Sequence, residues 1–157
     1  MFEAIYKLTA NIKKLNINTI SVSVFALPDT KKFILRLNRV EQLYNEGIDI
    51  NDKIIGVYSY ATAILTGEES YIYNGLVNVK KAGEPYTLYD SGEFYESFSV
   101  VMYKDGFTIK ADTEKLNDSI NQKQILGLTD ESKNELAKNI TPLLQEAIRE
   151  AILKEVL

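Results

Sequence analysis

The feature that most constrains the fold is a stripe of apolar side chains at helical spacing near the C-terminus. Thr129 or Asp130 is a suitable N-cap. The apolar side chains that follow recur every three or four residues: Leu136, Ile140, Leu143, Leu144, Ala147, Ile148, Ala151 and Ile152. Pro142 lies inside this stripe, so either a long helix kinks there or a second helix starts with Thr141 as cap and Pro142 at N1. The stripe is wider than one small sheet needs, and part of it could meet a partner.

A second pattern predicts a β-hairpin over residues 98–111. The segments FSVVMYK (98–104) and FTIKA (107–111) each alternate side chains between two faces, one of which should be buried. Asp105-Gly106 stands between them, and Asp-Gly is a favoured hairpin turn. The predicted class is therefore α+β: a small antiparallel sheet with this central hairpin, packed by N-terminal helices and the long C-terminal helix.

The N-terminal part predicts two helices and one ambiguous element. Apolar residues at helical spacing fall in 2–15 and again in 29–46, where Asp29 could cap the start and Gly47 could follow the end. Residues 17–27 fit a strand by alternation and also fit a helix capped by Asn18 or Thr19.

Residues 47–56 predict a loop. Asp49, Asn51 and Asp52 are oxygen-bearing side chains that suggest a calcium site. The glycine and the glutamate that an EF-hand loop requires are missing from the corresponding positions. We therefore favour an Asx turn, in which the aspartate accepts hydrogen bonds from nearby backbone N–H groups.

Residues 57–90 are rich in tyrosine and are punctuated by glycine. We expect short strands or an extended connection within one domain that spans residues 1–157. Tyrosine offers a large, stiff contact area with a polar tip, so Tyr58, Tyr60, Tyr71 and Tyr73 are candidate interface residues. The competing interpretation is that several of these rings complete the edge of the core.

The stretch from Asp90 to Phe98 predicts a turn that leads into one helical turn. Asp90 or Ser91 can accept from backbone N–H groups, Gly92 permits a tight reversal, and the aromatic residues Phe94, Tyr95 and Phe98 would anchor the turn against the sheet. Ser91 is also a candidate nucleophile, although a nucleophile needs an adjacent base.

The composition argues against most enzyme classes. The chain has no cysteine and no histidine, which removes disulfides, thiolate catalysis and the serine–histidine triad. A net charge of −4 does not suggest a general nucleic-acid binder. The N-terminus lacks the features of a signal peptide, and no apolar run is long enough for a membrane span. We expect synthesis in the cytoplasm, no membrane partner, no cofactor and no metal.

Three segments, in this order, resemble structural proteins of tailed bacteriophages: GEPYTLYDSGEFYESF, DGFTIKA and ILGLTDES. SGEFYESF is similar to the (S/T)-G-x-[aromatic or Leu]-x-x-S motif of virion-morphogenesis and tail-completion proteins. ILGLTDES resembles the segment that opens their final helix. LNRVEQLYNEGIDINDKIIGVYS resembles proteins from phages of Bacteroidetes hosts, including crAss-like phages. The resemblance covers residues 34–140.

This resemblance implies a small α+β virion protein, made in the bacterial host, that completes the head–tail connector or tail tube. It implies a ring of identical subunits in contact with portal, adaptor or tail proteins, with DNA passing through the lumen. It carries no catalytic residues, so we expect no enzyme activity. Two alternatives stay open. One is a Tyr-rich module that binds a carbohydrate or peptide. The other, ranked lower, is a carboxylate-based hydrolase that would use Glu93 and Glu96.

Overall fold

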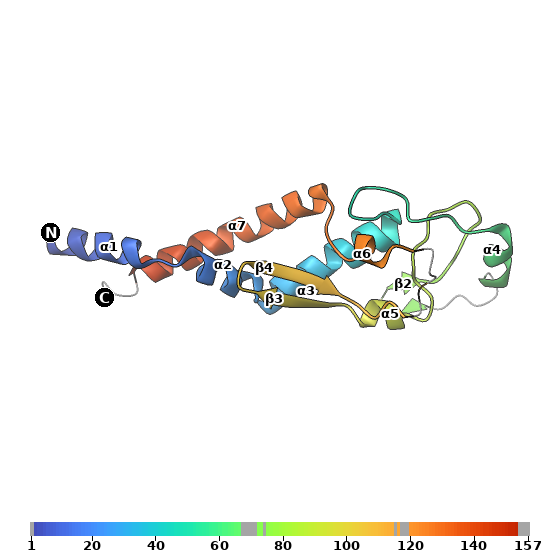
Figure 1. Cartoon of the computed structure of the whole chain (residues 1–157), viewed down its shortest axis with the longest axis horizontal. Coiled ribbons are helices and arrows are strands. Elements are labelled where there is room, and N and C mark those ends of the chain that lie inside the picture. The colour runs from blue at the N-terminus through green and yellow to red at the C-terminus, as the bar shows by residue number, and fades with distance from the viewer. Residues whose placement is uncertain (1, 67–71, 74, 115, 117–119, 154–157) are drawn as a thin grey trace.

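The chain forms an elongated α+β structure, as predicted (Figure 1). The computed structural model describes residues 2–66, 72–73, 75–114, 116 and 120–153. In chain order the elements are α1 (Phe2–Lys14), α2 (Ile17–Phe25), α3 (Pro28–Arg36), the π-helix η1 (Leu37–Glu46), α4 (Tyr60–Thr66), β1 (Ile72–Tyr73), β2 (Leu76–Val77), α5 (Glu93–Glu96), β3 (Ser99–Tyr103), β4 (Gly106–Lys110), α6 (Gln122–Ile125) and α7 (Asp130–Leu153). Helix α1 lies at one end of the long axis and α4 at the other.

The predicted hairpin is confirmed as the antiparallel pair β3–β4. Val100 lies opposite Ile109 and Met102 opposite Phe107, and these four side chains form the face that packs against the core. The predicted turn is wrong by one residue. Tyr103 pairs with Gly106, so the two central residues are Lys104 and Asp105, and neither has a positive φ. Gly106 is instead the first residue of β4, the fourth position of the turn, which often carries glycine in type I turns.

Residues 17–25 form a helix, which resolves the ambiguity between helix and strand. Asn16 precedes it, and its side chain accepts a hydrogen bond from the backbone N–H of Thr19 at 3.1 Å. The helix cap is therefore neither of the two residues predicted. Val24 on its inner face is almost fully buried.

The predicted helix over 29–46 exists, but in two parts and without a cap from Asp29. Helix α3 begins at Pro28, whose missing N–H costs nothing in the first turn, and Leu27 makes no side-chain cap. Helix α3 continues into η1 without a break, and Gly47 caps the C-terminal end of η1. Gly47 has φ +64°, so its predicted role after the helix is confirmed.

Helix α7 runs without interruption through Pro142, so a separate helix starting there is ruled out. The hydroxyl of Thr129 accepts from the N–H of Ser132 at 3.2 Å, which confirms one of the two predicted caps. Asp130 follows in the first turn, where a hydrogen bond from Lys133 lowers the pKa of its carboxyl group. Helix α7 packs mainly against α2, and more lightly against α1 and α3.

Two buried amides of η1 hold the loop that leads into α7. Asn38 donates to the carbonyls of Ile125 at 3.0 Å and Gly127 at 2.6 Å. Gln42 donates to the same Gly127 carbonyl at 3.1 Å and accepts from the backbone N–H of Thr129 at 3.1 Å. Both side chains are inaccessible to solvent. Polar core residues were not expected here, because Asn38 and Gln42 lie among the apolar residues of the predicted helix.

The connection over 57–90 is more structured than predicted. It contains the helix α4, which was not expected, and the short pair β1–β2. An isolated bridge joins Val57 to Pro85, so the two ends of the connection lie side by side. Asp49 accepts from the N–H groups of Asn51 and Lys53 at 2.7 and 3.1 Å, which confirms the Asx turn just before this region.

Candidate assembly surface

The tyrosines of the connection divide into a buried group and an exposed group. Tyr58 has 8% of its surface exposed, whereas Tyr60, two residues later, has 75% exposed. Tyr71 lies outside the described residues, and only the backbone of Tyr73 is described, in β1. Of the four candidate interface tyrosines, the structure therefore places one in the core and one at the surface.

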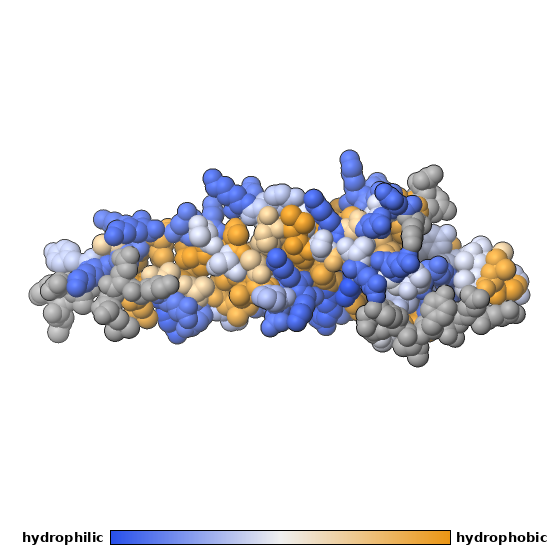
Figure 2. All heavy atoms as spheres, turned by 90° about the horizontal axis from the view of Figure 1, so that it is seen from below, coloured by the Kyte–Doolittle hydropathy of each residue, from blue (hydrophilic) through white to orange (hydrophobic). Residues whose placement is uncertain are grey.

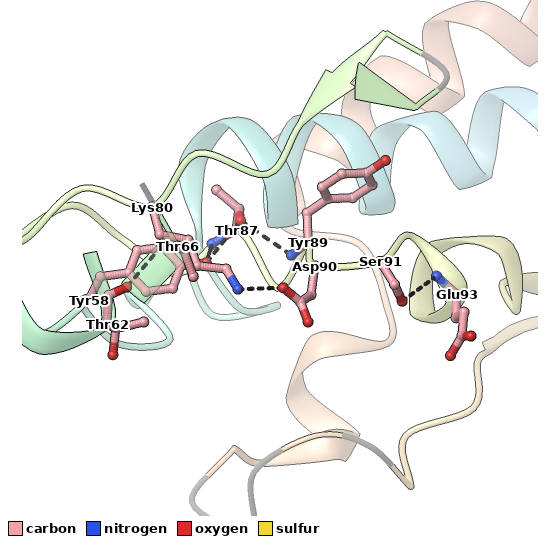
Figure 3. Close-up of polar contacts among 9 residues, drawn as sticks. All are labelled: Tyr58, Thr62, Thr66, Lys80, Thr87, Tyr89, Asp90, Ser91 and Glu93. Atoms are coloured by element: carbon pink, nitrogen blue, oxygen red, sulfur yellow. Dashed lines mark hydrogen bonds and ion pairs between the residues drawn. The ribbon is translucent and has the colours of Figure 1, made fainter. Parts of the chain in front are cut away.

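Tyr58 belongs to a hydrogen-bonded network centred on Thr87 (Figure 3). The hydroxyl of Tyr58 lies 2.9 Å from the Thr87 hydroxyl and accepts from the Thr87 N–H at 3.0 Å. The Thr87 hydroxyl accepts from the N–H of Tyr89, and the Thr87 carbonyl accepts from the hydroxyl of Tyr95. The buried hydroxyls of Tyr58 and Tyr95 are thus both satisfied by Thr87, as buried polar groups require.

The aromatic rings around this network pack edge to face. Tyr89 contacts Tyr44 with ring centroids 5.8 Å apart and Tyr95 with centroids 5.2 Å apart, both nearly perpendicular. Phe94 lies 4.9 Å from Phe98 in a similar arrangement. This geometry is favoured by the ring quadrupoles. The prediction that Phe94, Tyr95 and Phe98 anchor the turn is borne out by their place in and against the core cluster.

Burial has an electrostatic consequence at Tyr95. Loss of solvation raises the pKa of its hydroxyl well above the usual value, and the neighbouring Tyr58 and Tyr44 add to the rise. The ring is almost fully buried, and its hydroxyl is committed to the Thr87 carbonyl. Tyr95 therefore acts as a neutral structural donor.

Of the two polar residues that could cap the predicted turn, Ser91 bonds within the turn, whereas Asp90 pairs with a lysine outside it. Gly92 has φ +90°, which confirms the reversal expected there. The Ser91 hydroxyl accepts from the N–H of Glu93 at 3.5 Å, and Asp90 forms an ion pair with Lys80 at 2.8 Å (Figure 3). Glu93 and Glu96 are exposed on α5.

A small cavity of about 220 Å³ lies beside this turn, lined among others by Arg36, Arg39, Tyr89, Gly92 and Tyr95. One terminal nitrogen of Arg39 donates to the Tyr95 carbonyl at 2.8 Å. Its Nε is buried and has no hydrogen-bond partner among the described residues. A small acceptor such as a carboxylate could bind there, because a guanidinium presents several donors in one plane.

Helix α4 carries three strongly exposed apolar side chains at its end of the molecule. Tyr60, Ile64 and Leu65 have 75, 56 and 79% of their surface exposed. Figure 2 shows apolar side chains at the tip where α4 lies in Figure 1. The sequence prediction included Tyr60 but missed Ile64 and Leu65. The signal that could have found them is the run SYATAILT, with Ser59 as a helix cap before two i, i+4 pairs of apolar residues.

A broad groove lies between β4 and the N-terminal half of α7. Its volume is about 580 Å³, and its walls include Phe25, Phe107, Leu126, Leu136 and Ile140. Among the strands that the structure describes, β4 pairs with β3 alone, so its other edge has no strand partner there. The groove and α4 are thus a concave and a convex apolar surface on different parts of one chain.

Comparison of the chain with protein-family models, curated proteins and solved structures found no match. Among the residues that the structure describes, no group of three or more acidic side chains is arranged to hold a metal ion. Within those same residues, no helix is both long and apolar enough to cross a membrane.

Proposed function

We propose that this protein is a structural component of a tailed-phage virion, which assembles as a ring of identical subunits at the head–tail connector or in the tail. The resemblance of residues 34–140 suggests the family, and the exposed apolar face of α4 is the observation that carries the assembly role. Apolar side chains clustered on a protruding helix are costly to leave in water and commonly mark interaction sites.

The elongated shape supports this proposal. Exposed apolar side chains occur at both ends of the long axis: Tyr6 and Ile12 on α1, and Tyr60, Ile64 and Leu65 on α4 (Figure 1). A subunit with different apolar surfaces at separate places can make heterologous contacts, in which one face meets a different face of its neighbour. Such contacts generate rings when the rotation closes.

The buried tyrosines support a mechanical role for the connection over 57–90. The hydroxyls of Tyr58 and Tyr95 both bond to Thr87, which fixes the base from which α4 projects. A protein that transmits force between the parts of a particle needs its contact elements held rigidly by the body of the subunit.

Three measurements test the proposal. Light scattering coupled to size-exclusion chromatography should give the mass of a multi-subunit assembly, and negative-stain electron microscopy should show closed rings. Quantitative mass spectrometry of purified virions of the encoding phage should find the chain at a fixed copy number per particle. Absence of the chain from intact virions would exclude a structural virion role.

A further inference from the structure

Helix α4 has the reverse of the usual amphipathic arrangement. Its apolar side chains Tyr60, Ile64 and Leu65 face outward, whereas the half-buried residues are Thr62, Ala63 and Thr66. A surface helix normally turns its apolar stripe toward the core and its polar face to water. Within one subunit, the hydrophobic side chains of α4 therefore contribute little to folding.

The threonines on the inner side are satisfied locally. The Ser59 hydroxyl accepts from the N–H of Thr62 at 3.1 Å and lies 2.9 Å from the Thr62 hydroxyl. The hydroxyl of Thr66 donates to the Thr62 carbonyl at 2.9 Å. The helix is thus capped and internally bonded, with its apolar face left free for a contact outside the subunit.

The groove between β4 and α7 has the matching chemistry. Its walls are mainly apolar. Two charged residues border it: Lys133, which is paired with Asp130 at 2.8 Å, and Asp105, which lies in the exposed turn between β3 and β4. Residues 60–66 contain no ionisable group besides the Tyr60 phenol. A neutral helix on the apolar walls brings no charge of its own and leaves Asp105 in its exposed turn, whereas a charged side chain packed on those walls would lose solvation.

We propose that α4 of one subunit docks into the groove between β4 and α7 of the next subunit. The inference rests on the proposed function, because it supplies the contact that a ring requires. Helix α4 projects from one end of the molecule, while the groove lies along its middle, so the contact joins two chains (Figure 1). The interface is heterologous: each subunit offers one helix and one groove.

Two substitutions disable the two sides separately. Leu65→Asp places a carboxylate on the docking face of α4, and Ala137→Arg places a guanidinium at an exposed position that lines the groove. Each has a matched control: Val79→Asp at another exposed apolar residue, and Asn139→Arg at an exposed position of α7 outside the groove. Circular dichroism and thermal unfolding check that all four variants are folded.

The expected result is that both controls assemble like the wild type, whereas Leu65→Asp and Ala137→Arg associate at least about tenfold more weakly. For Leu65→Asp, that factor corresponds to losing the burial of one large apolar side chain. For Ala137→Arg, the weakening comes from an unpaired guanidinium that docking would bury. A mixture of the two weakened variants should form pairs of chains, because the first keeps an intact groove and the second an intact α4. Each pair has no further functional contact, so the mixture should not form rings.

Several results would overturn the inference. Wild-type mass for either weakened variant would show that α4 or the groove is not part of the contact. A mixture that stays monomeric would show that an intact α4 of one chain does not dock into an intact groove of another. A monomeric wild type at high concentration would also overturn it. The virion measurement is independent of these outcomes, so the proposed function can stand while this contact fails.

Discussion

Replacing Gln42 tests whether the buried amides of η1 secure the start of α7. The Gln42 side chain accepts from the Thr129 N–H and donates to the Gly127 carbonyl, and it is almost completely buried. Gln42→Met keeps a similar length and fills the same space, but methionine offers no comparable hydrogen bond. The substitution therefore isolates the polar contribution from the packing contribution.

The expected loss of unfolding free energy depends on which buried groups lose their hydrogen-bond partners. The Gly127 carbonyl keeps the shorter hydrogen bond from Asn38, at 2.6 Å, so it stays satisfied. The Thr129 N–H loses the acceptor that the structure assigns to it. An unsatisfied buried donor costs about 1–3 kcal/mol. Unfolding free energy should therefore fall by about 1–3 kcal/mol, with Tm lowered by about 2–4 °C for each kcal/mol in a chain of this size.

The assay is urea unfolding followed by circular dichroism, with Gln145→Met as the control. Gln145 lies exposed on α7, so the same substitution there should change the unfolding free energy by no more than about 0.5 kcal/mol. If Gln42→Met unfolds at the same urea concentration as Gln145→Met, the hydrogen bonds of Gln42 do not stabilise the fold. A changed slope with urea would instead indicate an altered unfolded or native state.

Two further perturbations test the backbone and the tyrosine network. Gly47→Ala should destabilise the fold by at least about 1–2 kcal/mol, because φ is +64° and a new Cβ would lie 2.5 Å from Pro85 Cβ. Gly83→Ala is the comparison. Gly83 has φ +80° but open space around it, so this substitution should lower the thermal stability less than Gly47→Ala does. Tyr95→Phe removes the donor to the Thr87 carbonyl and should cost about 0.5–1.5 kcal/mol at neutral pH. Because burial raises the pKa of Tyr95, its neutral form stabilises the fold fully below pH about 10, and this contribution is lost as pH rises toward the folded-state pKa. Unfolding midpoints measured from pH 7 upward should therefore fall less steeply for Tyr95→Phe than for the wild type; parallel curves would contradict this assignment.

The fold class could be predicted from the sequence because its main elements bury one face. Helix α7 and the β3–β4 hairpin each show a clear period, which comes from packing against a common core. The details that failed depend on local geometry. The hairpin turn moved by one residue because strand pairing extends to Tyr103 and Gly106. The start of α3 depends on Pro28 rather than on a side-chain cap.

The candidate site was harder to predict because tyrosine suits both a core and an interface. Composition alone cannot separate Tyr58 from Tyr60, since both stand in the same polar, tyrosine-rich run. The separation depends on the distant Thr87, which bonds to the hydroxyl of Tyr58. Helix α4 was missed because it is short. Its seven residues hold only two i, i+4 pairs of apolar side chains, which is too few to establish a helical period within the tyrosine-rich run.

The contacts at the base of α4 explain how so short a helix could serve as a docking element. A seven-residue helix is not stable alone in water, because few hydrogen bonds offset the cost of nucleation. Here two backbone hydrogen bonds fix the segment just before α4. The Tyr58 N–H donates to the Glu84 carbonyl at 3.0 Å, and the Gly83 N–H donates to the Tyr58 carbonyl at 2.9 Å. The hydroxyl of Tyr58 is held by its hydrogen bond to Thr87. Ser59, the next residue, caps the N-terminus of α4. Much of the ordering cost of α4 is therefore met during folding of the subunit rather than during docking, and preorganisation of this kind strengthens binding without adding contacts.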